Sequence, residues 1–215
     1  LGEGDKARAR ELFTMLVRIA LVIGIVLAVG GFIFMRPLVV ALGAEGEMIA
    51  KAVIYGRIVI VSMPAFIIQM AFQSFYMTAE KPELGTQMSL MSGCTNIALD
   101  ALFIAGFGWG LAGAAIATAI SLTAGGIFPL WYFSSKKNDS HLKFVQFDRI
   151  DWRTIGKTCT NGMSEYVGNI ALNVVSIGYN LQLMKYIGEN GVSAYGIIMY
   201  VGFIFAAVFI GYNLC

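Results

Sequence analysis

Long stretches without charged residues dominate this sequence. Apart from Asp100, no Lys, Arg, Glu or Asp occurs in five runs: residues 19–35, 58–79, 84–135, 166–184 and 190–215. A helix that crosses the hydrocarbon core of a bilayer needs roughly 20 apolar residues, so each run fits one helix and the longest fits two. Runs of this length favour helices over barrel strands, whose signature is a short alternation. We therefore expect an all-α membrane protein, a polytopic bundle with about six transmembrane helices.

The composition agrees with a bilayer environment. Hydrophobic residues make up 58% of the 215 residues and charged residues only 13%. The net charge of +2 is small, and the basic residues lie in the connections between apolar runs. We therefore expect membrane lipid as the surrounding partner and no nucleic-acid partner.

The expected helices span residues 12–35, 50–78, 84–106, 110–134, 154–185 and 190–212. Three glycines in residues 106–110 permit a tight reversal between the third and fourth helices. Pro64 and Pro129 fall inside helices and should bend them. The positive-inside rule places residues 1–13, 80–83 and 134–158 in the cytoplasm, because most basic residues lie there. These residues are Lys6, Arg8, Arg10, Lys81, Lys136, Lys137, Lys143, Arg149, Arg153 and Lys157.

Both ends of the chain suggest a segment of a longer protein. The sequence opens at Leu1 without an initiator Met and stops at Cys215 at the end of an apolar run. Cys94, Cys159 and Cys215 are far apart and odd in number, so we expect neither a disulfide framework nor a metal site. A Walker-type loop, a histidine cluster and a hydrolase serine motif are missing from the sequence, which favours transport over catalysis.

Asp100 is the one carboxylate in the longest apolar run, and Asn96 precedes it by four residues. On a helix this spacing places both side chains on the same face. A charged group deep in a membrane costs on the order of 2.5 to 3.5 kcal/mol and usually faces a bundle interior or a wet cavity. Asp100 is therefore a candidate site for a proton or a cation. The alternatives are a structural hydrogen bond between helices and a hydrated position near the outer interface.

The helix that follows carries a ladder of small residues, GLAGAAIATAISLTAGG. Small residues allow helix backbones to approach closely, so packing explains most of this ladder. Thr118 lies within it and could add a hydroxyl to the polar spot formed by Asn96 and Asp100.

Two further sets of polar residues could line a cavity. Gln69 and Gln73 lie four residues apart in the second expected helix, and Tyr76 lies one turn beyond. In the fifth expected helix Asn161, Glu165, Asn169 and Asn173 recur every four residues. Such stripes cannot face lipid at low cost, so each lines either a packed interface or a hydrated pathway.

The motifs of this chain resemble those of the multidrug and toxic compound extrusion (MATE) family. The resemblance rests on LGEGDKARARE, MPAFIIQMAFQSFYMTAEKPELGTQMSL, NIALDALFIAGFGWGLAGAAIATAIS and ENGVSAYGIIMYVGFIFAAVFIGYN. It implies a two-lobe transporter with twelve helices, of which this chain resembles helices three to eight. Residues 1–135 would supply the last four helices of the N-terminal lobe, residues 136–153 the cytoplasmic loop between the lobes, and residues 154–215 the first two helices of the C-terminal lobe.

The resemblance also implies roles for individual residues. In one branch of the family an Asp and an Asn of the fifth helix and a Thr of the sixth belong to a cation site, and Asp100, Asn96 and Thr118 match them. Gln69, Gln73, Tyr76, Glu165, Asn169 and Asn173 are the residues expected to line the substrate cavity. Gln69 or Gln73 stands near the place where the family has an Asn. Glu165 lies near the start of its helix, so it is not equated with the family's deeper Glu.

These expectations define one leading function and two alternatives. The leading hypothesis is a sodium- or proton-coupled antiporter, not an enzyme, that exports small organic and often cationic compounds by alternating access. The expected setting is a monomer in the plasma membrane of a bacterium, without a cofactor other than the coupling ion. The alternatives are a lipid-linked oligosaccharide flippase of the same superfamily and a membrane scaffold subunit that does not transport.

Overall fold

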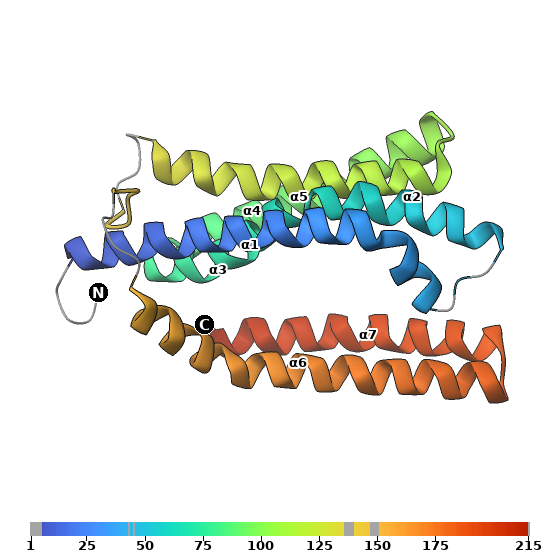
Figure 1. Ribbon diagram of the computed structural model, residues 1–215. Coiled ribbons are helices and arrows are strands. Elements are labelled where there is room, and N and C mark those ends of the chain that lie inside the picture. The colour runs from blue at the N-terminus through green and yellow to red at the C-terminus, as the bar shows by residue number, and fades with distance from the viewer. Residues whose placement is uncertain (1–5, 43, 45, 136–139, 147–150, 215) are drawn as a thin grey trace. The chain divides into compact units, whose positions relative to one another are not determined.

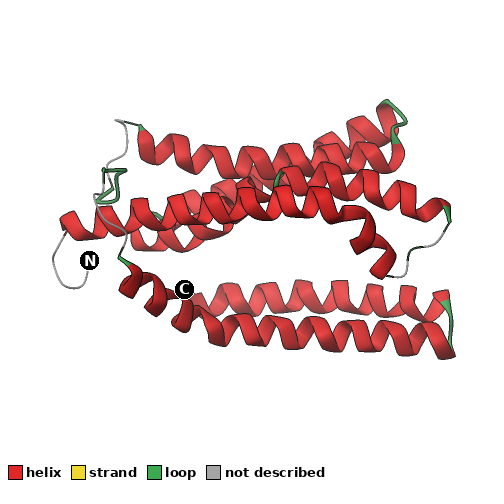
Figure 2. Cartoon of the chain, viewed as in Figure 1, coloured by secondary structure: helices red, strands yellow, loops and turns green. Residues whose placement is uncertain are grey.

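The computed structural model describes residues 6–42, 44, 46–135, 140–146 and 151–214. These residues form helices and loops, and no strand occurs among them (Figure 2). In chain order the elements are α1 (Lys6–Ala41), α2 (Glu47–Val61), α3 (Met63–Thr78), α4 (Pro82–Asp100), the π-helical turn η1 (Ala101–Gly106), α5 (Gly110–Ser134), α6 (Trp152–Tyr186) and α7 (Glu189–Leu214) (Figure 1). The all-α fold class expected from the sequence is confirmed.

The helix boundaries extend the apolar runs in both directions. The first helix begins at Lys6 rather than at residue 12 and ends at Ala41 rather than at residue 35. Its first turns contain Lys, Ala, Arg and Glu, which have high helix propensity, so the helix continues beyond the apolar run. The fourth expected helix, residues 110–134, has the bounds of α5.

The second expected helix is divided into α2 and α3, which meet at Ser62 with a bend of 50°. Pro64 lies in the first turn of α3, where its missing N–H costs least and its ring disfavours helical geometry just before it. The Ser62 hydroxyl donates to the Val59 carbonyl at 2.7 Å and so satisfies one of the groups left at the break. The bend expected from Pro64 is therefore present.

Pro129 has a smaller effect than the sequence suggests. α5 is a single helix from Gly110 to Ser134 with Pro129 inside it, so this proline does not divide the helix. Pro129 lies close to the end of α5, where the loss of one backbone hydrogen bond affects only the last turns.

Length and apolar composition identify fewer spans than the six expected. Among the described residues α1, α5 and the continuous helix Pro82–Gly106 qualify individually, and α2 with α3 qualifies as one bent span. α6 is long enough, but polar residues recur along it and it does not qualify. The apolar stretch Asn190–Phe205 of α7 is shorter than a span. Three to four membrane-spanning helices are thus supported.

The chain separates into two compact units, Leu1–Ile150 and Asp151–Cys215. The first unit contains α1 to α5, and the second contains α6 and α7, which run side by side as a hairpin (Figures 1 and 2). Residues 136–139 and 147–150 of the expected inter-lobe loop lie outside the described residues, with Lys136, Lys137 and Arg149 among them. The assignment of the two units to two transporter lobes stays a prediction.

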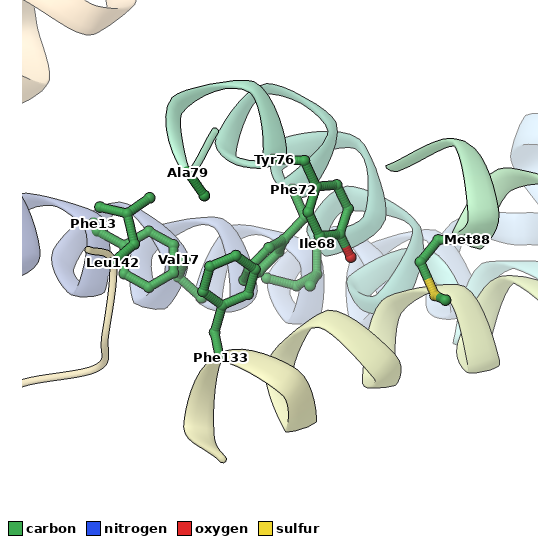
Figure 3. Close-up of a cluster of buried hydrophobic side chains, with 9 residues drawn as sticks. All are labelled: Phe13, Val17, Ile68, Phe72, Tyr76, Ala79, Met88, Phe133 and Leu142. Atoms are coloured by element: carbon green, nitrogen blue, oxygen red, sulfur yellow. The ribbon is translucent and has the colours of Figure 1, made fainter. Parts of the chain in front are cut away.

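Aromatic rings form the core at one end of the first unit. Phe13 of α1 lies 4.9 Å from Phe75 of α3 and 5.0 Å from Phe144, measured between ring centroids. Phe133 of α5 lies 5.2 Å from Phe72 of α3 and projects between α1 and α3 (Figure 3). Because the apolar side chains of three helices meet here, this cluster fixes the positions of α1, α3 and α5 relative to one another.

The polar segment after α5 takes part in the same core. Leu142 is 2% exposed and belongs to the buried cluster (Figure 3). The Arg10 Nε donates to the His141 carbonyl at 2.8 Å, and the Val145 N–H donates to the Thr14 hydroxyl at 3.1 Å. Residues 140–146 therefore form a strap that is anchored on the first turns of α1.

Glycines bring α1 and α5 into close contact with α3. A Cβ atom added at Gly24 of α1 would lie 2.7 Å from the Pro64 Cα, and one added at Gly126 of α5 would lie 2.7 Å from the Ala65 Cα. Both distances are shorter than real Cβ contacts allow. Gly126 belongs to the small-residue ladder noted in the sequence, whereas Gly24 was not singled out there. Both glycines allow close helix packing beside the bend between α2 and α3.

Candidate functional site

Asn96 and Asp100 lie in the last two turns of α4, on the face that their spacing predicts. Asp100 is the final α-helical residue, and the chain then continues as the π-helical turn η1. The Phe107 N–H donates to the Leu102 carbonyl at 2.9 Å, five residues earlier, which is the π-helical pattern. Widened turns of this kind occur often at functional sites.

One oxygen atom of the Asp100 carboxylate lacks a hydrogen-bond partner among the described residues. The residue is half-buried, and its Oδ1 atom is a buried oxygen without a hydrogen-bond partner in the described part of the chain. Buried polar atoms are nearly always paired, so each exception requires an explanation such as an ion, a water molecule or a proton. Asp100 therefore has an acceptor oxygen available to a ligand.

The facing helix α5 places Thr118 close to the level of Asn96. The buried Ser92 hydroxyl of α4 donates to the Ser121 carbonyl of α5 at 3.1 Å, which sets the register of the two antiparallel helices. Four residues further along α4, Asn96 comes level with residues 117–118, and Asp100 comes level with residues 113–114. Thr118 thus lies about one helical turn from the level of Asp100. Within α5, the Thr118 carbonyl accepts a hydrogen bond from the Ser121 hydroxyl at 2.9 Å.

The turn after η1 holds α4 and α5 together at this end. Gly108 and Gly110 have φ angles of +68° and +54°, which L side chains rarely adopt, so the expected glycine-rich reversal is present. Phe103 stacks on Trp109 at 5.3 Å between ring centroids. A Cβ at Gly113 would lie only 3.0 Å from the Phe103 Cβ, so the first turn of α5 packs directly on η1.

The three polar residues predicted on α3 occupy different environments. Gln69 is half-buried against Gly125 of α5, and its Oε1 atom is a second buried oxygen without a partner among the described residues. Gln73 is exposed and donates from Nε2 to the Ser89 hydroxyl at 3.1 Å. Tyr76 is 3% exposed and lies in the aromatic core, with its ring centroid 6.0 Å from that of Phe133 (Figure 3). Tyr76 and the exposed Gln73 therefore do not share one environment.

In the second unit the predicted stripe of α6 faces α7 along part of its length. An open cavity of about 450 Å³ lies along the two helices, with the exposed side chains of Asn169 and Asn173 in its wall. Glu165 is exposed and lies one turn before the cavity; its carbonyl accepts from the Asn169 side chain at 3.0 Å. The other residues of the wall are Leu172, Ser176 and Asn180 of α6 and Tyr195, Gly196, Met199, Tyr200 and Phe203 of α7.

The hydrogen bond from the Ser92 hydroxyl to the Ser121 carbonyl was not among the features predicted from the sequence. Ser92 precedes Asn96 by four residues, so the stripe of α4 could have been extended to it from spacing alone. The π-helical geometry of η1 had no comparable signal in the sequence.

The three residues predicted to form the cation site all carry oxygen atoms. In the part of the chain that the structure describes, no group of three or more His, Cys, Asp or Glu side chains lies together. Asp100, Asn96 and Thr118 instead offer one carboxylate, one amide oxygen and one hydroxyl. Oxygen ligands of this type suit hard cations.

Comparisons with known proteins find similarity to the MatE family and to multidrug export proteins. The MatE family model matches residues 1–102. The multidrug export protein MepA of Staphylococcus aureus (strain MRSA252) is 25% identical over 197 residues, which cover 92% of this chain and 43% of that protein. MepA of Staphylococcus haemolyticus (strain JCSC1435) is 27% identical over the same length. The chain therefore spans less than half the length of the curated relatives that it matches.

Solved structures show the same fold. The inward-facing conformation of a multidrug resistance MATE family transporter of the MOP superfamily matches 90% of this chain and 44% of its own chain, with a TM-score of 0.79 and 20% identity. A MOP superfamily transporter from Pyrococcus furiosus, described as having a binding pocket of reverse polarity, matches 93% of this chain and 44% of its own, with a TM-score of 0.82 and 19% identity.

Proposed function

We propose, from the match to the MatE family model and the similarity to MATE transporters, that this chain is a segment of a MATE family transporter. The protein it comes from would export small organic compounds in exchange for sodium ions or protons. The relatives named multidrug export proteins support the export of organic compounds. The observation that carries the exchange is the buried Oδ1 atom of Asp100, which has no hydrogen-bond partner among the described residues and lies in the continuous apolar helix Pro82–Gly106.

A permanent charge at this position would be costly. Insertion of an Asp at the centre of a spanning helix costs on the order of 2.5 to 3.5 kcal/mol, and an unpaired buried oxygen adds to that cost. Both costs fall when a proton or a sodium ion neutralises the carboxylate. Asn96 and Thr118 would support that state as hydrogen-bonding partners or as neutral oxygen ligands. Asp100 would therefore alternate between a loaded and an unloaded state.

Loading of Asp100 would be linked to release of the exported compound. In an alternating-access cycle, an ion that enters from outside binds Asp100, weakens substrate binding and is released on the cytoplasmic side. Gln69, Gln73, Glu165, Asn169 and Asn173 are the proposed substrate-lining residues, and Tyr76 is left out because it lies in the aromatic core. The proposed setting is a monomer in the bacterial plasma membrane, without a cofactor other than the ion.

The test is the substitution Asp100→Asn in the full-length protein. The amide keeps the size of the side chain but can neither release a proton nor attract a cation, so gradient-driven efflux of a fluorescent dye from cells should fall to the level of cells without the protein. Glu83→Gln is the matched control, because Glu83 is an exposed carboxylate in the first turn of the same helix. Dye efflux by the Glu83→Gln protein should equal that of the native protein.

Undiminished efflux by the Asp100→Asn protein would refute the assignment. Intrinsic tryptophan fluorescence of the purified protein provides a second measurement, in which sodium or a change of pH should alter the signal of the native protein and not that of the variant. A scaffold subunit would respond to neither ion. Dissipation of the proton gradient and removal of sodium, each applied separately during efflux, identify the coupling ion.

A further inference from the structure

Two arginines lie at the same end of the apolar runs of α1 and α2. Arg36 follows the charge-free run 19–35, Arg57 precedes the charge-free run 58–79, and both side chains are exposed. Arg18 stands at the other end of the first run, and the 18-residue step from Arg18 to Arg36 spans roughly 27 Å of helix. This length is close to a hydrocarbon thickness of roughly 30 Å. Arg36 therefore lies at the edge of the hydrocarbon, where the lipid headgroups begin.

Helix packing brings the two arginines to one level. α1 and α2 lie side by side (Figure 1). A Cβ added at Gly56 of α2 would meet the Met35 side chain of α1, so these two residues lie opposite each other in the antiparallel pair. Arg36 and Arg57 are their immediate neighbours in sequence, and their levels differ by only about 3 Å along the helix axes. The two charges therefore lie at nearly the same bilayer depth.

Phe32 of α1 connects the two arginine side chains. The guanidinium carbon of Arg57 lies over the Phe32 ring, 5.0 Å from its centroid. Arg36 follows Phe32 by four residues, so both side chains occupy one face of α1. A guanidinium that stacks on a ring keeps its planar set of N–H donors available for hydrogen bonds. Arg36 and Arg57 therefore offer their donors on the same surface.

The two guanidiniums are not neutralised by a described carboxylate. In the part of the chain that the structure describes, neither forms an ion pair, whereas the Lys51 Nζ of α2 lies 3.7 Å from the Glu47 Oε2. Like charges at one level repel each other, and charged groups of membrane helices are normally paired. An anion bound between the two guanidiniums would relieve both costs. Phosphate is the anion that suits them best, because its oxygens match the planar donors of arginine.

The surface of α1 beneath the arginines suits a lipid tail. Exposed apolar side chains lie on the face of Arg36 at alternating steps of four and three residues toward the bilayer centre, which keeps them in one stripe. They are Phe32, Val29, Ile25 and Val22. From Arg36 to Val22 the stripe extends roughly 21 Å, past the middle of a hydrocarbon core roughly 30 Å thick. A phospholipid would cover both the arginines and the stripe, whereas a free phosphate ion would leave the stripe bare.

We propose that Arg36 and Arg57 bind the phosphate of an anionic phospholipid, whose acyl chain lies along the apolar stripe of α1. The lipid belongs to the outer leaflet, because this end of α1 is opposite the basic connections that the positive-inside rule places in the cytoplasm. An anionic lipid is favoured over a zwitterionic one, since a choline or ethanolamine group would add a third positive charge beside the two guanidiniums. This site goes beyond the proposed function: the lipid stabilises the pair of α1 and α2 and is neither the exported compound nor the coupling ion.

Thermal unfolding of the purified full-length protein in detergent measures this binding, because a ligand of the native state raises Tm. The probes are phosphatidylglycerol, phosphatidylcholine with the same acyl chains, and inorganic phosphate. With the native protein, phosphatidylglycerol should raise Tm at a lower concentration than phosphatidylcholine does. A large excess of inorganic phosphate should not reproduce the rise, because it lacks the tail.

The substitutions Arg36→Gln and Arg57→Gln should each require about 10-fold more phosphatidylglycerol for the same rise in Tm, as the loss of a charge-assisted hydrogen bond implies. The response to phosphatidylcholine should stay within about 2-fold of the native response, because its own cation limits its contact with the guanidiniums. Either arginine variant serves where the other does not fold. The matched control is Lys51→Gln, which removes the same charge from α2 at a residue that is already paired with Glu47. The control should respond to both lipids as the native protein does.

Three results would overturn the proposal: equal native responses to the two lipids, an unchanged phosphatidylglycerol response in both arginine variants, or an equal loss in Lys51→Gln. A rise in Tm with inorganic phosphate alone would indicate a site for free phosphate and would also refute the assignment to a lipid. The titration needs no ion gradient, so its outcome is independent of the efflux test on Asp100.

Discussion

The contact between Gly126 of α5 and Ala65 of α3 leads to a quantitative prediction for the substitution Gly126→Ala. The added Cβ would lie 2.7 Å from the Ala65 Cα, and it would also meet the Ala65 carbonyl group. Both neighbours are backbone atoms, so no side-chain rotation can relieve the overlap. Overpacking of this kind costs about 1 to 3 kcal/mol, because the helices must separate.

Thermal unfolding of the purified protein in detergent measures this cost. For a chain of this size each kcal/mol lowers Tm by roughly 2 to 4 °C, so Gly126→Ala should lower Tm by about 2 to 12 °C. Gly30→Ala is the control, because Gly30 lies within helix α1 and a Cβ added there meets nothing within 4 Å. Alanine has the higher helix propensity, and the control should unfold at the same temperature or slightly higher.

The comparison of the two variants tests the packing and not a general property of glycine. A Tm for Gly126→Ala equal to that of the native protein would show that α3 and α5 are not in backbone contact beside the bend. An equal fall in both variants would show that flexibility of the glycines, and not their small size, is what the helices require.

Two further predictions concern the strap and the turn. Leu142→Ala should destabilise the protein by about 2 to 4 kcal/mol, because it leaves a cavity among aromatic rings. Lys143→Ala is the control and should have little effect, because Lys143 is exposed. Equal thermal unfolding temperatures of the two variants would contradict the anchoring of the strap. Gly108→Ala should cost about 1 kcal/mol of stability, because its φ is +68°. Gly106→Ala is the control and should cost less, because its Cβ would lie at an ordinary 3.6 Å from Leu102. An equal chemical denaturation midpoint for the two variants would refute the turn geometry.

The sequence predicts the helices well for a physical reason. A backbone in lipid has to pair its own polar groups, so each long charge-free run leaves few alternatives to a helix. The same reasoning places Asn96 and Asp100 on one face, because a helix fixes the angle between residues four apart. Pro64 likewise marks the bend between α2 and α3, because its missing N–H acts locally.

Features that depend on contacts between distant residues were not predictable in the same way. The segment around Leu142 is polar overall and looks like a solvated loop, but its alternation of Leu142 and Phe144 with polar neighbours places two apolar side chains against Phe13. The environment of Tyr76 also depends on α5, since Phe133 lies beside its ring. The polar spacing of α3 alone contains no information about that neighbour.

The π-helical turn after Asp100 makes the length of this segment as consequential as its composition. Removal of one residue between Ala101 and Gly106 would convert the wide turn into an ordinary α-helical one, which the backbone accommodates readily. Every residue before the deletion would then rotate by about 100° relative to the turn that joins α5. Such a deletion would preserve the helix, the apolar run and every polar side chain. It would nevertheless turn the carboxylate of Asp100 away from α5.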